Sequence, residues 1–312
     1  MRKAFVNTLL EVAGKDSRIY LLTGDLGFSV LEPFRKEFPK RFVNMGVAEQ
    51  NMIGVAAGLA LSGKIVFVYS IVPFVTMRCF EQIRNDLCFQ NLRVRLVGVG
   101  GGFSYGTAGP THYALEDMAI MRSLFNMTVI APGDPKETEM AVKASIKHPG
   151  PVYIRIGGGI GGKGTPVYSR KFNFRIGKGI LIEDGSDVTI IATGSMLQCA
   201  LESAGLLKER KISVRLISMP TVKPVDERII LDSLKKTKAI FTVEEHNTIG
   251  GLGSAVSEVL IKSKPESFIF RKFAVPDKYI KETGTQKYLL NKYGLSSDRI
   301  AKEIISDIKR RK

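Results

Sequence analysis

One carboxylate in the sequence stands where it could take part in proton transfer. Glu49 lies at the start of residues 47–61, which after the first turn are apolar on every face, as in a helix buried inside a protein. A carboxyl carried into an apolar interior can hold a proton near neutrality, which suits it to exchange protons with a ligand. The alternative is a first-turn glutamate that complements the helix dipole. The residues of this segment alone favour neither interpretation.

A histidine in another segment could act on the same ligand. Of the three histidines, His112 lies in a loop shaped by glycine and proline, residues 109–112, which follows an apolar segment. Loops after the strands of a parallel sheet are where α/β proteins bind ligands, so this position favours a functional role. His148 is typical of a surface turn, and His246 could line an interface. Asp25 also follows an apolar segment, as a turn residue or as a neighbour of His112 at one sheet edge.

The elements that position these side chains alternate along the first half of the chain. Strands are predicted at residues 18–23, 41–44, 64–70, 92–99, 127–130 and 151–156, and helices at 3–14, 33–38, 47–61, 76–89, 115–124 and 135–147. Most of the strands are continuously apolar, without polar alternation. This pattern predicts a parallel sheet that is covered by helices on both faces.

A Gly-, Lys- and Ser-rich stretch then interrupts the pattern, and we interpret residues 159–175 as a linker. The alternation returns with strands at 187–192, 213–217, 239–243 and 267–273, and helices at 196–209, 228–235, 253–263 and 297–309. The predicted fold class is α/β with two domains, one over residues 1–158 and a smaller one over residues 176–312.

Composition limits the class of protein. With 44% hydrophobic and 24% charged residues in 312, the chain is predicted to be globular, with room for two cores. No apolar run is long enough to cross a bilayer and no signal-peptide layout precedes the first helix, so we expect a cytoplasmic protein without membrane contact. Cys79, Cys88 and Cys199 show no paired spacing, which favours buried thiols over disulfides or a metal site.

The formal net charge of +16 raises the question of nucleic-acid binding. The basic residues are scattered in short clusters that resemble solvated helix faces. No aromatic residues alternate with them to form a stacking platform for bases. We therefore expect no nucleic-acid partner, and attribute the charge to a preference for anionic small molecules or an acidic protein partner.

Three motifs together resemble transketolase and its thiamine-diphosphate-dependent relatives. They are residues 46–52 (GVAEQNM), 109–112 (GPTH) and 243–254 (VEEHNTIGGLGS), which occur in the order of that family. The resemblance covers nearly the whole chain, but only the pyrimidine-binding (Pyr) domain and the C-terminal domain of a full-length transketolase.

The family's remaining domain, called PP, has no counterpart in the sequence. In such enzymes the PP domain holds the cofactor diphosphate and a metal ion (Mg²⁺ or Ca²⁺) through a Gly-Asp-Gly signature, which is absent here. The resemblance therefore implies one subunit of a split transketolase. It also implies a partner subunit that supplies the PP domain (the N-terminal section) and holds the metal, and self-association to a dimer or an α2β2 assembly.

The resemblance also assigns cofactor-binding residues. Glu49 would face N1′ of the aminopyrimidine of thiamine diphosphate, with Gln50 beside it in the same motif. Phe74 would provide the aromatic platform under the pyrimidine, and Asp25 matches an acidic residue near the cofactor. None of these residues is expected to bind a metal ion in this chain.

The substrate side is assigned in the same way. His112 would stabilise oxyanion or hydroxyl groups of the substrate adduct. Ser29 and Arg155 resemble positions that hold the substrate phosphate, and the fork of an arginine suits two phosphate oxygens. These roles make both Glu49 and His112 catalytic and imply a small sugar substrate.

Two departures from the family pattern concern the sugar. Ala108 stands where transketolase has an aspartate, and Gly100 lies where a second active-site histidine is expected. Both changes remove polar contacts, so a modified or nucleotide-linked sugar, or another 2-oxo donor, remains open. The leading hypothesis is two-carbon ketol transfer. The alternatives are a subunit like the β subunit of a 2-oxoacid dehydrogenase or like deoxyxylulose-phosphate synthase, and a non-catalytic assembly subunit.

Overall fold

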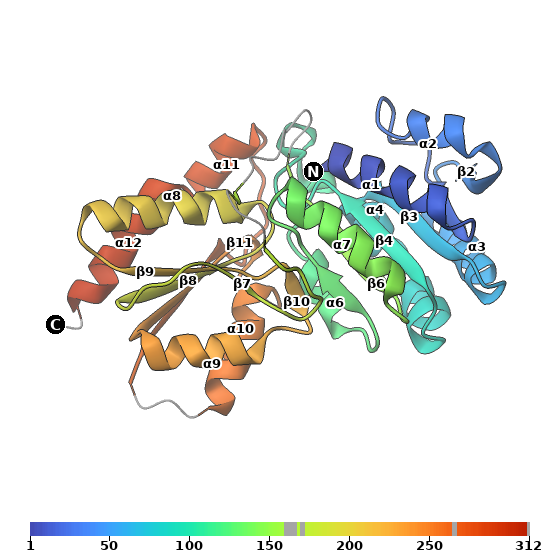
Figure 1. Ribbon diagram of the computed structural model, residues 1–312. Coiled ribbons are helices and arrows are strands. Elements are labelled where there is room, and N and C mark those ends of the chain that lie inside the picture. Colours follow the sequence, from blue (N-terminus) through green and yellow to red (C-terminus); the bar gives the residue numbers. More distant parts are fainter. Residues whose placement is uncertain (159–166, 169–171, 264–266, 311–312) are drawn as a thin grey trace.

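The computed structural model describes residues 1–158, 167–168, 172–263 and 267–310. Figure 1 shows two sheets side by side, each covered by helices on both faces. The fold class predicted from the sequence, α/β with two domains, is confirmed. Among the described residues, no helix is both long and apolar enough to cross a membrane.

The first sheet has seven strands in the order β10-β5-β6-β4-β3-β1-β2. Its strands from the first half of the chain are β1 (Ile19–Thr23), β2 (Phe42–Asn44), β3 (Ile65–Ile71), β4 (Val94–Val99), β5 (Thr128–Ile130) and β6 (Val152–Ile156). All of these pair in parallel. Because the side chains of β4, β5 and β6 are all buried, both faces of the sheet centre must be covered.

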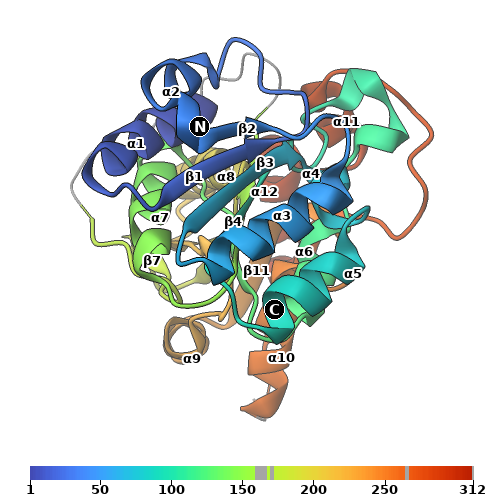
Figure 2. The same ribbon diagram turned by 90° about the vertical axis from the view of Figure 1, so that its right-hand side faces the viewer.

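Helices cover the two faces of this sheet (Figure 2). They are α1 (Arg2–Lys15), α2 (Glu32–Glu37), α3 (Glu49–Leu61), α4 (Val72–Thr76), α5 (Phe80–Gln82), α6 (Asp117–Ser123) and α7 (Pro135–Lys147). Helices α1 and α7 share one hydrophobic cluster with the sheet, and α3 belongs to another on the opposite face. Helix α3 therefore carries Glu49 along the face away from the N-terminal helix.

The second sheet has five strands in the order β12-β11-β8-β9-β7. They are β7 (Ile180–Glu183), β8 (Val188–Ala192), β9 (Val214–Ser218), β11 (Ala239–Asn247) and β12 (Ile269–Val275). Its helices are α8 (Met196–Glu209), α9 (Glu227–Lys236), α10 (Leu252–Lys262), α11 (Gln286–Lys292) and α12 (Ser297–Arg310). Helices α8 and α12 lie on one face, and α9 and α10 on the other (Figure 1).

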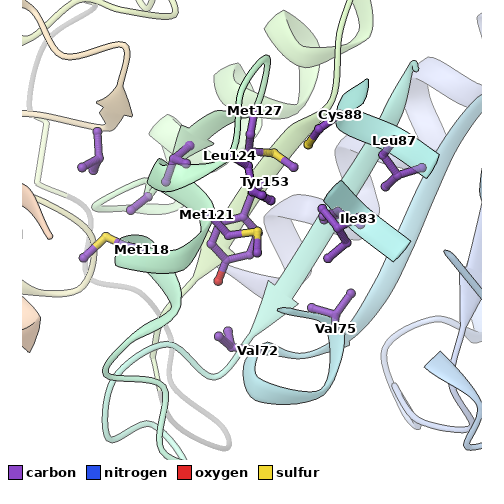
Figure 3. Close-up of a cluster of buried hydrophobic side chains, with 14 of the residues drawn as sticks. Val72, Val75, Ile83, Leu87, Cys88, Met118, Met121, Leu124, Met127 and Tyr153 are labelled. Carbon is purple, nitrogen blue, oxygen red and sulfur yellow. The ribbon is translucent and has the colours of Figure 1, made fainter. Parts of the chain in front are cut away.

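A short strand joins the two halves. Strand β10 (Thr221–Lys223) comes from the second half of the chain but pairs antiparallel with β5 at the edge of the first sheet. The hydrophobic core also crosses this boundary, since Met121 of α6 and Leu252 of α10 belong to one cluster. Figure 3 shows part of that cluster, with Met121 beside Tyr153. The two domains therefore pack as neighbours in one continuous structure.

The structure differs from the predicted elements at several places. The predicted helix 76–89 is replaced by α4, α5 and a π-helical segment (Ile83–Phe89), because helical structure starts earlier, at Val72, and breaks before α5. Strands β7 and β10 and helix α11 were not predicted. Each is short, so its sequence carries few positions from which a period can be recognised. The predicted linker falls largely on residues 159–166 and 169–171, which lie outside the described residues.

Candidate active site

Glu49 lies in the interior, at the first position of α3, with its side chain 1% exposed. Ser70, near the end of β3, donates a hydrogen bond from its hydroxyl to Oε1 over 3.1 Å. Arg78 forms an ion pair with Oε2, with Nη1 at 2.6 Å. The end of β1 also approaches closely, since a Cβ at Gly24 would lie 3.2 Å from Oε1. The carboxylate is therefore fixed by Ser70 and Arg78 and lies close to the end of β1.

Phe74 connects this carboxylate to His112. The Arg78 guanidinium carbon lies 4.4 Å from the centre of the Phe74 ring. The other ring contact is with His112, at 5.3 Å between centroids in an edge-on arrangement. The His112 imidazole is half-buried, and its Nδ1 lies 3.0 Å from the Thr111 hydroxyl. The structure thus brings Glu49, Phe74 and His112 together through a series of direct contacts.

Asp25 and Ser29 lie on the loop between β1 and α2, at the carboxyl edge of the sheet. Both are exposed and have left-handed backbones, with φ of 55° and 60°. Such conformations in residues other than glycine are sparsely populated and cluster at functional sites. The Asp25 carboxylate accepts a hydrogen bond from the Asn44 amide at 2.9 Å, and the Ser29 backbone N–H donates to Glu32 at 2.7 Å. Their exposed side chains could receive a ligand.

Gln50 follows Glu49 at the start of α3 and is exposed. Its position differs from that of its neighbour because adjacent helix residues point about 100° apart. The structure therefore places Gln50 beside the predicted cofactor site and leaves its amide open to solvent.

Arg155 is buried away from solvent, unlike the phosphate ligand predicted from the sequence. Its Nε donates to the Asp117 carboxylate at 2.7 Å, and Nη2 donates to the carbonyls of Ala114 and Glu245 at 2.8 and 2.9 Å. The side chain is 2% exposed. These contacts, together with the burial, give Arg155 a structural role between the domains. A strand-end arginine is ambiguous in sequence because its partner, Asp117, is 38 residues away.

The structure shows the surroundings of Gly100 and Ala108, the two positions that depart from the family pattern. Gly100 is left-handed, with φ of 88°, and a Cβ there would meet the Tyr105 ring at 2.1 Å. The Tyr105 ring therefore occupies the space that a side chain at position 100 would need, and it lies 6.3 Å from the His112 ring. Ala108 is exposed in the turn between them.

Sequence reasoning missed Ser70, Arg78 and Tyr105. The residues around Ser70 indicate a strand and give no sign of a functional role. Arg78 falls in a segment predicted as one continuous helix. The break between α4 and α5 is the feature that places Arg78 beside Glu49. Pro73 fits the first turn of α4, but no local signal in the sequence marks the break at residues 77–79.

Comparisons with known proteins identify the family of the chain. The family model "Transketolase, pyrimidine binding domain" matches residues 1–158, and "Transketolase, C-terminal domain" matches residues 177–300. The two models together span most of the sequence, and the chain belongs to the transketolase family. The resemblance found from the three motifs is thereby confirmed.

Individual relatives match over nearly their whole length. The chain is 41% identical to a "Putative transketolase C-terminal section" of Methanocaldococcus jannaschii, over 99% of this chain and 96% of that protein. It is 38% identical to a subunit of the apulose-4-phosphate transketolase of Phocaeicola vulgatus, over 99% and 97%. A solved structure described as "Split gene transketolase, inactive beta4 tetramer" superposes with a TM-score of 0.89 and 39% identity, covering 99% of this chain and 98% of that one.

Membership of this family implies dependence on thiamine diphosphate. The residues present fit the pyrimidine half of that cofactor. A buried carboxylate suits a ring nitrogen that exchanges a proton, and a neighbouring aromatic ring suits a planar heterocycle. Glu49 and Phe74 supply these two groups, joined through Arg78.

Proposed function

We propose that this chain is the Pyr-domain subunit of a split transketolase, which transfers a two-carbon ketol unit between sugars. The observation that carries the proposal is the contact series Glu49–Arg78–Phe74–His112 at the carboxyl edge of the first sheet. Support comes from the relatives, of which one is named a C-terminal section and another is named as one subunit of a transketolase.

A partner subunit completes the proposed enzyme. It contributes the PP domain, which holds the cofactor diphosphate and the Mg²⁺ or Ca²⁺ ion, because the Gly-Asp-Gly signature is absent from this sequence. The active site then lies between the two subunits in an α2β2 assembly. The solved relative described as an inactive tetramer of β chains supports self-association and the need for a second subunit.

The protein's own residues have distinct tasks in this proposal. When bound, thiamine diphosphate supplies the stabilisation of a carbanion. Glu49 would hold a proton at N1′ of the aminopyrimidine, and the Ser70 hydroxyl, which donates to Oε1, would help to hold the carboxyl in place. Phe74 would supply an aromatic surface for the pyrimidine. Gln50 and Asp25 line the cofactor site, and these contacts orient the cofactor relative to the substrate.

His112 acts on the substrate. Its ring is held between Phe74 and Tyr105, which limits its rotation. It stabilises a developing oxyanion or a sugar hydroxyl through one of its nitrogens. Ser29 contributes to the site of the substrate phosphate.

The sugar differs from a standard pentose phosphate. Tyr105 takes the space at Gly100, and Ala108 removes a carboxylate from the loop, so two polar contacts to a linear sugar are lost. A relative named for apulose 4-phosphate supports a phosphorylated sugar of unusual structure. We therefore propose a modified sugar phosphate as donor or acceptor.

The free state of Cys79, Cys88 and Cys199 agrees with a reducing compartment, and we retain the cytoplasm as the proposed location.

The test is reconstitution with a PP-domain partner and a panel of donors. The complex should transfer a ketol unit from ketose phosphates and leave pyruvate unchanged. Decarboxylation of pyruvate in preference to ketose cleavage would instead assign a deoxyxylulose-phosphate-synthase-like or 2-oxoacid-dehydrogenase-like reaction. A stable complex without any thiamine chemistry would identify a non-catalytic assembly subunit.

A further inference from the structure

The loop that carries His112 is held by the second domain. This loop, residues 100–114, is closed at its base by two hydrogen bonds between Gly102 and Ala114, at 2.9 and 3.0 Å. Phe103 and Tyr113, which lie inside it, belong to the hydrophobic cluster of the second domain, with their rings 5.2 Å apart. Their side chains tie the loop to the core of a domain from which it does not originate.

Glu245 of β11 makes the polar part of this attachment. Its side chain is buried, and Oε1 accepts a hydrogen bond from the backbone N–H of Phe103 at 2.7 Å. The amide of Gln286 donates to both carboxyl oxygens at 2.9 Å, and the Ser195 hydroxyl donates to Oε2 at 2.6 Å. Gln286 and Ser195 of the second domain therefore hold the carboxylate that accepts this backbone N–H of the loop.

The loop has a conformation that admits this carboxylate. Gly102 is left-handed, with φ of 68°, and a Cβ there would lie 2.2 Å from the carboxyl carbon of Glu245. Glycine is thus required both for the backbone angle and for the close approach. These two requirements at Gly102 indicate that the loop and the Glu245 carboxylate pack together in one specific arrangement.

A second attachment lies nearer to His112. The backbone N–H of Gly284 donates to the Gly106 carbonyl at 3.1 Å, and the Tyr113 hydroxyl donates to the Glu282 carbonyl at 2.5 Å. Residues 282–284 lie just before Gln286, the partner of Glu245. The same segment therefore holds the loop at two places.

We infer that Glu245 is a positioning residue: with Gln286 it fixes the loop that presents His112, so that the C-terminal domain sets the geometry of an active site in the Pyr domain. The inference rests on the proposed function, since it takes the role of His112 from there. It assigns to the second domain a task in turnover besides assembly.

The chain offers a matched control in the neighbouring residue. Glu244 is buried like Glu245, but its carboxylate accepts the backbone N–H groups of Leu252 and Gly253, at 2.6 and 2.7 Å. These groups start α10. Among the hydrogen bonds of the described residues, Glu244 makes none to the loop. Glu244→Gln therefore perturbs a buried carboxylate of the same domain without touching residues 100–114.

The experiment compares Glu245→Gln with Glu244→Gln in the reconstituted complex. A glutamine at 245 replaces one acceptor oxygen of the carboxylate by an NH2 group, which cannot accept from Gln286, Ser195 or Phe103, and so weakens the attachment of the loop. We expect Glu245→Gln to lower kcat about tenfold, because small displacements of reacting groups are costly, and to leave cofactor affinity unchanged. Glu244→Gln should lower the melting temperature while kcat stays within about twofold.

A charge swap provides the rescue. In Glu245→Gln/Gln286→Glu the amide and the carboxylate exchange places, and the pair is restored with the same total charge. The double variant should recover most of the lost kcat. Equal losses of kcat in the Glu245 and Glu244 variants, or a double variant no better than Glu245→Gln, would overturn the inference. If Glu245→Gln does not fold, Gln286→Leu removes one partner of the carboxylate and should show the same fall in kcat.

Hydrogen exchange on the chain alone separates this inference from the proposed function. The Phe103 amide should exchange faster in Glu245→Gln and remain protected in Glu244→Gln, whatever reaction the complex performs. Unchanged protection of Phe103 in Glu245→Gln would contradict the attachment itself. Ketol transfer absent from the wild-type complex, with the exchange difference present, would instead count against the proposed function alone.

Discussion

The carboxyl edges of the two sheets carry similar side chains in different states. At the first edge, Glu49 is buried but its partner Arg78 is 42% exposed, and His112 is only half-buried. At the second edge, Glu244, Glu245 and His246 are each at most 1% exposed. Glu244 caps a helix and Glu245 holds a loop. The carboxylates of the second edge bind backbone N–H groups, whereas Glu49 at the first edge pairs with a partly exposed arginine and, in the proposed function, faces the cofactor.

Packing between the domains explains this difference. Parallel sheets place ligands at the carboxyl ends of their strands. In this molecule the loop of residues 100–114 covers that end of the second sheet, and Arg155 donates to the backbone there. Burial then decides the chemistry of the histidine: it lowers the pKa of His246 to about 4, so the ring is neutral and its Nδ1–H donates to the Asn247 carbonyl. In the described part of the chain, the second domain does not cover the first edge in this way, and the proposed function places cofactor and substrate there.

The largest expected effect comes from removing the carboxylate of Glu49, to which the proposed function assigns proton transfer. Glu49→Gln should lower ketol transfer about 10²- to 10⁴-fold, since a positioned acid contributes a factor of that size. Assembly with the partner should persist, as judged by size-exclusion chromatography. Activity within about threefold of wild type would show that Glu49 has no role in proton transfer.

Substitution of the histidine at the first edge should lower kcat more than substitution of the histidine at the second edge. His112→Asn is expected to lower kcat about 10- to 100-fold through loss of a group that stabilises developing charge. His246→Asn removes a buried histidine of the second edge. It should lower the melting temperature and leave kcat nearly unchanged, and the reverse order of effects on kcat would contradict the contrast between the edges.

Arg78 tests whether the buried carboxylate depends on its exposed partner. Arg78→Met leaves Glu49 buried without a cation and should reduce the free energy of unfolding by about 1–2 kcal/mol, a figure that allows for screening of the exposed arginine. Urea denaturation measures this change. Arg78→Lys keeps the charge and should lose less, while losing the planar contact with Phe74.

The smallest effect concerns pH. Burial raises the pKa of Glu137, which lies between the domains and accepts the Ser218 hydroxyl at 2.6 Å, to about 7. The folded pKa exceeds the ordinary value of 4.5, so the stability that the protonated form confers is present below about pH 4.5 and lost as pH rises through 7. The stability advantage of wild type over Glu137→Gln should therefore shrink from pH 5 to pH 8, by about 1–3 kcal/mol. A constant difference across this range would show that Glu137 does not titrate there.

Local sequence patterns predicted most of the fold, because the periodicity of a strand or a helix can be recognised from neighbouring residues. The all-apolar segment after Glu49 forms α3, and the continuous apolar strands form the centre of the sheet. The same patterns could not show that β10 crosses from the second half of the chain to the first sheet, because that pairing joins residues about 90 positions apart.

The residues of the candidate site were also predicted only in part. Glu49 and His112 were identified from motifs, and the structure places both near Phe74. Arg155 was predicted to bind phosphate, but it pairs with Asp117, and only the tertiary structure could reveal that partner. Arg78 was not predicted at all, since a break in a helix placed it beside Glu49.

Calorimetric titration of thiamine diphosphate with Mg²⁺ tests the central claim most directly, that this chain holds one half of a cofactor site. The chain alone should bind the cofactor too weakly to measure, and the complex with its PP-domain partner should bind it tightly, with one cofactor for each pair of subunits. Tight binding to the chain alone, or the absence of binding to the complex, would contradict the account.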